Sequence, residues 1–239
     1  MGKRWVRSLT FENVKPFSGK QTIRFGKGIN VIAGPPKSGK SVLLYAIGGA
    51  WYGELLNFYG APWSNDSRTN FATGRRMDNG DYRIRLETNK GVTEIVETTN
   101  GALLKRVWTR SKRWSDKLIA ILDEYSLRAE VELAESRAEV SNSGRGKLAT
   151  SNRGSGGSKG TKISRLLKGF CDSRRIEVFL LDDIFTGLDA PSRATILDCL
   201  TKLPCQVILT TSAPEAFPSK LIRARLEVLP GGGLRIRAV

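Results

Sequence analysis

Residues 34–41, GPPKSGKS, have the composition and spacing of a phosphate-binding loop. A glycine is followed, after four residues, by Gly-Lys-Ser, so that backbone N–H groups can surround a phosphate. Lys40 is expected to reach the β- and γ-phosphates, and the Ser41 hydroxyl to bind Mg²⁺. Pro35 and Pro36 have no N–H to donate, but they lie on the entry side of the loop, where they stiffen the chain. We therefore expect ATP and Mg²⁺ to bind here, through Gly34, Pro35, Pro36, Lys37, Ser38, Gly39, Lys40 and Ser41.

A second motif, the acidic segment VFLLDD, ends at residue 183. An apolar strand would place Asp182 at its carboxyl end, where the carboxylate can hold Mg²⁺ through water. Asp183 follows and can face an attacking water as the catalytic carboxylate, together with Lys40. The structural alternative for Asp183 is a cap of a helix or loop.

Both ends of the chain resemble a known family. The segment LTFENVKPFSGKQTIRFGKGINVIAGPPKSGKSVLLYAI is similar to the start of SMC-type ABC ATPase heads, a group that includes SMC, RecF, RecN and the double-strand-break repair ATPase of the Mre nuclease complex. The segment FLLDDIFTGLD resembles the acidic block of the same heads. The resemblance covers residues 1–56 and 154–239.

The resemblance implies further nucleotide contacts. Ser155, Gly156 and Gly157 stand where the family has its signature turn, at a spacing before Asp182 that is familiar from SMC heads. A plain Gly/Ser-rich linker is the alternative for this segment. Asp189 corresponds to the D-loop aspartate. Lys15, within the first matched segment, completes the expected set of nucleotide-binding residues.

Several family residues are replaced in ways that weaken hydrolysis more than binding. The family's Pro-Asn-Gly-Ser is Pro-Pro-Lys-Ser here, and Asp183 stands in place of a longer glutamate. The signature lacks its leading Leu and has Ser158 where Glu or Gln is usual.

The two residues that help to position the attacking water in the family are also missing. The chain has no histidine for the switch position, where Thr211 or Ser212 stands nearby. Gln21 and Gln206 both fall outside the expected Q-loop. We therefore expect an ATPase with slow turnover.

Periodicity predicts the elements that carry these motifs. Apolar strands before the loop and before the acidic motif, with a helix after the loop, are the context that a phosphate-binding loop requires. The expected strands are 4–14, 21–25, 28–34, 82–89, 91–100, 101–110, 177–183, 205–212, 221–229 and 233–239. The expected helices are 40–51, 115–140, 161–170 and 191–203, with a linker over 141–160.

These elements predict one α/β domain over residues 1–239. It would have the P-loop ABC-type ATPase fold, with a mostly parallel core sheet and an N-terminal antiparallel β subdomain. Residues 1–56 and 154–239 would form the nucleotide-binding core. Residues 57–153 would supply antiparallel strands and a helical segment in place of the family's coiled coil.

Charge indicates the partner. The 239 residues include 39 Lys and Arg against 23 Asp and Glu, a net charge of +16, and the basic residues gather in 1–30 and 145–175. Such an excess favours a polyanion, and DNA bound without sequence preference fits it. An anionic lipid surface, a role in solubility and plain solvated faces are the alternatives. No apolar run is long enough to span a membrane. Three cysteines without metal spacing suggest reduced thiols in the cytoplasm.

The resemblance implies a homodimer that sandwiches ATP and binds DNA for repair, recombination or chromosome maintenance, with a possible partner protein. One alternative is a dimer that binds nucleotide and DNA without hydrolysis. The other is the ATP-binding subunit of a transporter, against which the strong positive charge argues.

Overall fold

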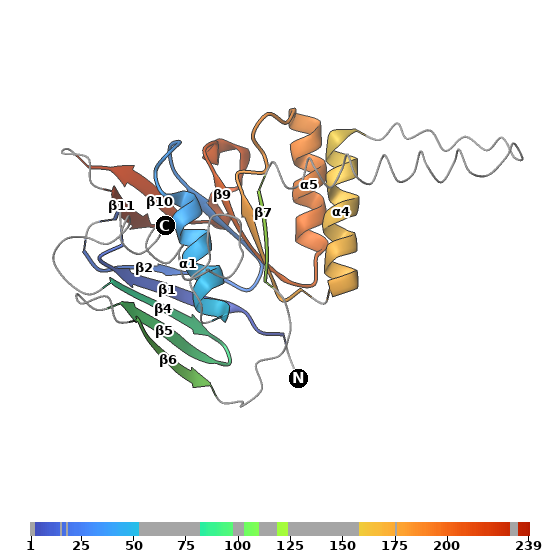
Figure 1. The fold of residues 1–239 in the computed structure, drawn as a ribbon. Coiled ribbons are helices and arrows are strands. Elements are labelled where there is room, and N and C mark those ends of the chain that lie inside the picture. The colour runs from blue at the N-terminus through green and yellow to red at the C-terminus, as the bar shows by residue number, and fades with distance from the viewer. Residues whose placement is uncertain are drawn as a thin grey trace, which may run out of the picture.

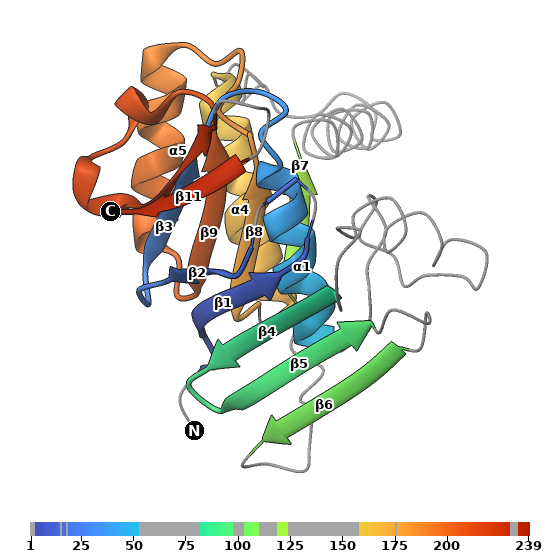
Figure 2. The same ribbon diagram turned by 90° about the vertical axis from the view of Figure 1, so that its left-hand side faces the viewer.

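Two β-sheets and the helices packed on them build the part of the chain that the structure describes (Figure 1). The computed structural model describes residues 3–14, 16–17, 19–52, 82–97, 103–109, 119–123, 158–174, 176–229 and 234–239. The layers are an antiparallel sheet, a helix, a mostly parallel sheet and a pair of helices (Figures 1 and 2).

The antiparallel sheet has the strand order β2-β1-β4-β5-β6. Its strands are β1 (Val6–Glu12), β2 (Gln21–Arg24), β4 (Tyr82–Thr88), β5 (Gly91–Glu97) and β6 (Leu103–Thr109). Leu9 pairs with Ile23 on one side and with Leu86 on the other, so the inward side chains of three strands form one apolar row. The predicted N-terminal hairpin and three-stranded meander are confirmed.

The core sheet has the order β11-β10-β3-β9-β8-β7. Its strands are β3 (Ile29–Ala33), β7 (Ile119–Asp123), β8 (Val178–Asp182), β9 (Gln206–Thr211), β10 (Ile222–Val228) and β11 (Leu234–Ala238). All neighbours are parallel except the hairpin of β10 and β11. Every residue of β3 and β9 is buried, as expected for strands covered on both faces. The carboxyl ends of these strands meet at one edge, where α/β sheets bind ligands.

One predicted element is wrong in part. We expected a helix over residues 115–140, but residues 119–123 form β7, which pairs in parallel with β8. The short apolar run Ile-Ala-Ile-Leu fits either period, and its place at the side of β8 decides for the strand. The other residues of that prediction, and residues 141–157 of the predicted linker, lie outside the described residues.

The helices cover the core sheet from both sides. They are α1 (Lys40–Tyr52), α4 (Lys159–Arg174) and α5 (Ala190–Lys202), with short 3₁₀ turns η1 (Pro214–Ala216) and η2 (Ser219–Leu221). Helix α1 lies between the two sheets, so residues 42–51 are buried all round rather than along a stripe. Helices α4 and α5 pack on the opposite face (Figure 1).

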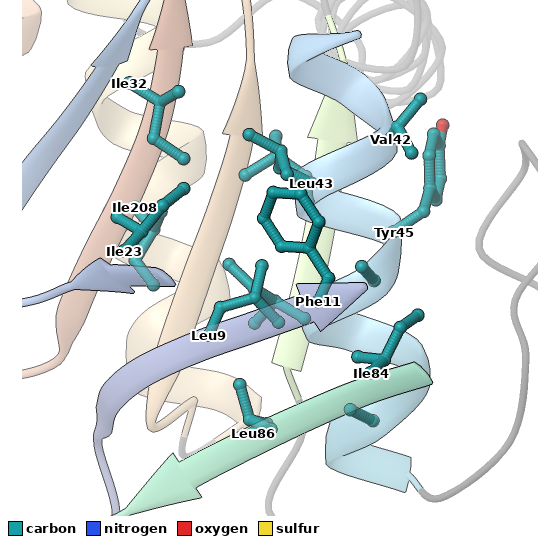
Figure 3. Close-up of a cluster of buried hydrophobic side chains, with 14 of the residues drawn as sticks. Leu9, Phe11, Ile23, Ile32, Val42, Leu43, Tyr45, Ile84, Leu86 and Ile208 are labelled. Carbon is teal, nitrogen blue, oxygen red and sulfur yellow. The ribbon is translucent and has the colours of Figure 1, made fainter. Parts of the chain in front are cut away.

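The apolar cluster around α1 fixes the helix in place (Figure 3). Leu9 and Phe11 from the antiparallel sheet meet Leu43 of α1, and Ile32 and Ile208 of the core sheet close the other side. Each of these five side chains is at most 1% exposed, which stabilises the fold by about 1.5–3 kcal/mol per side chain. Since α1 begins at Lys40, this packing also holds the end of the loop that precedes it.

Candidate nucleotide-binding and hydrolysis site

The predicted phosphate-binding loop joins β3 to α1 and has the tight backbone that it needs. Lys37 and Gly39 have positive φ angles of 61° and 77°. A Cβ at Gly39 would also lie 2.9 Å from Pro16 Cδ and 3.1 Å from Phe17 Cζ. Gly39 is therefore required both by its backbone conformation and by the close approach of the N-terminal turn.

Gly34 fixes the other end of the loop. Its N–H donates to Thr211 O at 3.1 Å, which ties the loop to the end of β9. A Cβ here would lie 2.7 Å from Leu226 Cβ of β10 and 2.8 Å from Ser38 Oγ. The loop is thus held between the two strands that flank β3.

Lys40 lies across the loop. Its Nζ donates to Gly34 O at 2.9 Å and to Pro35 O at 2.8 Å, and the residue is only 6% exposed. Burial lowers the pKa of Lys40, while the charges of Asp183 and Asp182 raise it. Two neutral carbonyls do not compensate the charge of a buried lysine. A phosphate would compensate it, because it carries the opposite charge, so the position of Lys40 suits phosphate binding.

Asp182 is the last residue of β8 and is bound by a residue that the sequence analysis missed. Thr210 Oγ1 donates to Asp182 Oδ1 at 2.6 Å and accepts from the N–H of Asp183 at 3.0 Å. Thr210 is fully buried in β9, where its neighbours Ile208 and Leu209 are apolar. A polar β-branched residue in a buried apolar strand is the signal that could have identified it.

Asp183 faces the end of β9. Its carboxylate accepts from Ser212 N at 3.4 Å and from Ser212 Oγ at 3.2 Å. Its φ of 49° is left-handed, a conformation that Asp and Asn adopt more readily than most residues. Ser212 lies near the expected switch position, and the structure places it on the predicted catalytic carboxylate.

Ser41 and Asp182 are the residues predicted to supply oxygen ligands for Mg²⁺. Asp182 Oδ1 is bound by Thr210, which leaves Oδ2 for a water or a cation. In the part of the chain that the structure describes, no group of three His, Cys, Asp or Glu side chains could hold a metal by itself.

The sequence comparisons agree with this geometry. Residues 8–185 match the AAA domain family. The chain belongs to the AAA domain family. No protein in the comparison with curated sequences matches it.

Solved structures show which AAA-domain fold this is. The SMC head domain from Thermotoga maritima has a TM-score of 0.66 at 16% identity, and 98% of each chain is covered. An SMC head bound to the C-winged helix domain of ScpA has a TM-score of 0.67 at 12% identity, again with 98% of each chain covered. The recombination mediator RecF with ATP has a TM-score of 0.60 at 15% identity, covering 99% of this chain and 100% of that one. This AAA domain therefore has the SMC head and RecF fold, as predicted.

Not every predicted site residue of this AAA domain can be placed. Lys15, Ser155, Gly156 and Gly157 lie outside the described residues, so their roles stay predictions. Asp189 is the N-cap of α5, where its side chain accepts from Ser192 N at 3.0 Å. Hydrogen bonding with the Ser192 hydroxyl, and then with the Ser192 N–H, lowers the pKa of Asp189.

The start of α4, directly after the predicted signature, packs on the start of α5. Gly160 N donates to Ser192 Oγ at 3.3 Å, and a Cβ at Gly160 would lie 2.7 Å from Ser192 Cα. The chain just after the predicted signature is thus held beside the helix that Asp189 caps.

Gln206, which the sequence analysis placed outside the Q-loop, has a structural role. Gln206 accepts from Val6 N at 2.8 Å and donates to Val6 O and Gly26 O, which joins the two sheets.

Asp123, which sequence reasoning missed, ends β7 in register with Asp182. The parallel pairing of β7 and β8 brings this third acidic position to the same edge of the sheet. The described residues include no helix that is long and apolar enough to cross a membrane.

Proposed function

We propose that this AAA-domain protein is an SMC/RecF-like ATPase that dimerises on ATP, binds DNA without sequence preference and hydrolyses ATP slowly. The observation that supports this most directly is the meeting of three predicted residues at one edge of the core sheet. Burial lowers the pKa of Lys40, and the nearby charges of Asp183 and Asp182 oppose this effect. Its role would be DNA repair, recombination or chromosome maintenance, in the cytoplasm, where three free cysteines stay reduced.

Each residue has a distinct part in this mechanism. Lys40 would bind the β- and γ-phosphates, and the N–H groups of the loop around Gly39 would bind the β-phosphate. Ser41 and Asp182 would hold Mg²⁺, which neutralises charge on the phosphates when bound. Asp183 would orient the attacking water and accept its proton. Ser212 keeps the Asp183 carboxylate in one orientation, and Thr210 fixes the backbone beneath it.

The dimer would complete the site. In this proposal the turn of Ser155, Gly156 and Gly157 from one protomer meets the γ-phosphate on the other, and Asp189 lies at the same interface. ATP would hold the dimer together, and hydrolysis would release it. A partner protein is also part of the proposal, since one SMC head of this fold is bound to the C-winged helix domain of ScpA.

The described residues support DNA as the partner. Helix α4 buries Gly160, Ile163 and Leu167, and its other faces carry Lys159, Lys162, Arg165 and Lys168. From Lys159 to Cys171 the sequence has no acidic residue. Arg4, from the N-terminal basic run, is less available for contact with DNA. Its guanidinium lies 3.9 Å from the centre of the Trp51 ring, and its backbone N–H is bound to Glu177.

Size-exclusion chromatography with light scattering, together with phosphate release, tests the proposal. Protein with ATP and Mg²⁺ should elute as a dimer, and duplex DNA should bind with an affinity that falls steeply as salt rises. A monomer under all nucleotide conditions would refute the sandwich. A stable dimer with no phosphate release would favour the non-hydrolysing alternative.

A further inference from the structure

The hairpin of β10 and β11 carries three arginines on one face. Its buried face holds Ala224, Leu226 and Leu234, which belong to the core around α1. Because side chains alternate along a strand, the other face carries Arg225, Arg235 and Arg237, with Glu227 as its one acid. Arg223 lies at the register irregularity between Ile222 and Ala224 and donates to the buried Asn30 Oδ1 at 3.2 Å. Helices α4 and α5 lie over the other end of the core sheet and leave this face uncovered (Figure 1).

The register brings like charges together. Arg225 lies directly opposite Arg237, an arrangement that destabilises a hairpin. Glu227 lies opposite Arg235, but its carboxylate is 3.8 Å from Arg237 Nη1, so the one acid of this face pairs with Arg237. Among the described residues, no carboxylate forms an ion pair with Arg225 or Arg235, and both residues are exposed.

Protection of the sheet edge does not account for these arginines. The edge of β11 is already occupied, because Gln21 donates to Leu234 O at 3.2 Å and accepts from Ile236 N at 2.7 Å. Lysine is the usual charge on a protected edge, whereas residues 222–239 contain four arginines and no lysine. Arginine is the residue that binds phosphate oxygens through two parallel N–H groups.

We propose that the outer face of the β10–β11 hairpin is a contact surface for the phosphate backbone of duplex DNA. The inference rests on the proposed DNA binding and names a surface for it outside the two basic runs of the sequence. Arg225 and Arg235 bind phosphates directly, and a phosphate between Arg225 and Arg237 relieves their repulsion. In β10, Arg225 is in register with Ala33, the residue before the phosphate-binding loop, so the surface adjoins the strand that leads into the nucleotide site.

Salt dependence of binding tests the surface. The double variant R225Q/R235Q is compared with R83Q/K202Q, which removes the same net charge from two exposed positions on other elements. Each lost phosphate contact reduces the slope of log affinity against log salt by about 0.9, so R225Q/R235Q should lose about 1.8 and bind about 10- to 100-fold more weakly at 0.1 M salt. R83Q/K202Q should keep the slope of the parent protein.

The outcomes separate the inference from the proposed function. If the parent protein does not bind duplex DNA at low salt, the proposed function fails. If the parent binds and R225Q/R235Q keeps the slope of the parent, the hairpin is not a contact surface for DNA.

A second measurement needs no variant. An arginine-specific dicarbonyl reagent applied to the parent protein, read by mass spectrometry, should modify Arg225 and Arg235 less when DNA is bound, and Arg83 equally with and without DNA. Equal modification of all three would also overturn the surface.

Discussion

Ser212 Oγ lies 3.2 Å from Asp183 Oδ2, so a residue just after β9 holds the carboxylate that follows β8. The Ser212 N–H points to the same carboxylate, 3.4 Å from Oδ1. A serine can orient a carboxylate, but its hydroxyl is neutral and short, so it cannot take the place of a histidine that reaches a γ-phosphate. We expect this pairing to set the position of Asp183 and to leave phosphate binding to Lys40.

Replacing Ser212 by alanine tests this pairing. S212A should lower ATP turnover by about 10- to 100-fold, because a catalytic group that moves by about 1 Å can lose that much rate. The affinity for ATP should stay the same, since Ser212 binds a carboxylate and not the phosphate-binding loop. Phosphate release and calorimetric titration measure the two effects. S219A, at an exposed serine of η2, is the control, and an S212A variant with the parent rate would contradict the role of Ser212.

Thr210 should matter for both acidic residues at once. T210V keeps the shape of the side chain but removes the hydrogen bonds to Asp182 Oδ1 and from Asp183 N, which leaves a buried N–H unpaired at a cost of about 1–3 kcal/mol. We expect a lower melting temperature, weaker Mg²⁺ dependence of ATP binding and slower turnover. T210S should restore all three, because the hydroxyl returns.

A structural role alone would give a different pattern. If T210V lowers the melting temperature but leaves the Mg²⁺ dependence and the rate unchanged, Thr210 only stabilises the sheet. T195V, on the exposed side of α5, should change none of these properties.

Local pattern was enough to predict the main elements of the nucleotide site. The β3–loop–α1 unit follows from an apolar strand, a motif of fixed spacing and a helix start, all within one short segment. The sequence placed Ser212 only near the switch position. Its contact with Asp183 could not be predicted, because the contact depends on the parallel pairing of β8 and β9. Thr210 was missed for the same reason, since its two partners are 27 and 28 residues away in the sequence.

The segment at 119–123 shows where local pattern fails. Five residues of mixed period cannot distinguish a strand from a turn of a helix. Residues 119–123 form a strand because they pair in parallel with β8. This pairing places Asp123 beside Asp182. No signal within the segment itself carries that information.

Glu177 should be important for stability rather than catalysis. It is 1% exposed, its Oε1 accepts from Arg4 N at 3.0 Å, and its charge opposes the effect of burial, which lowers the pKa of Arg4 to about 10. E177Q removes the charge beside a partly buried guanidinium and should lower the free energy of unfolding by about 3 kcal/mol, a fall in Tm of roughly 6–12 °C. Thermal unfolding measures this.

An exposed ion pair supplies the control for Glu177. Asp198 and Lys202 form an i,i+4 pair on α5 with side chains that are 63% and 72% exposed. D198N should change the stability by less than about 1 kcal/mol. Equal effects of E177Q and D198N would show that the charge of Glu177 has no special role.

Lys40 should be essential for nucleotide binding but not for the fold. K40A removes the cation that lies against Gly34 O and Pro35 O, and with it the charge that a phosphate would meet. ATP at 100 times its dissociation constant should stabilise the parent protein by about 2.7 kcal/mol and K40A by nothing measurable. The thermal shift with ATP and Mg²⁺ measures this, and K220A, at an exposed position of η2, is the control. An equal thermal shift for K40A would contradict the phosphate-binding role of Lys40.

The two adjacent aspartates should separate binding from hydrolysis. Asp183 is a methylene shorter than the glutamate that the family resemblance implies, and Ser212 stands nearby in place of a histidine, so the parent should turn over below about 1 s⁻¹ and form an ATP-bound dimer that lasts long enough to isolate. D183N should keep ATP binding and the dimer but lose the remaining phosphate release, because an amide cannot accept the proton of the attacking water. D182N should instead weaken Mg²⁺-dependent ATP binding, because Asp182 is the carboxylate at the end of β8 with Oδ2 left for the metal.

Chromatography with ATP and Mg²⁺, together with phosphate release, measures both variants. A D183N protein that hydrolyses ATP at the parent rate would show that Asp183 is structural and that the base lies elsewhere, with Asp123, in register with Asp182, as the next carboxylate to replace.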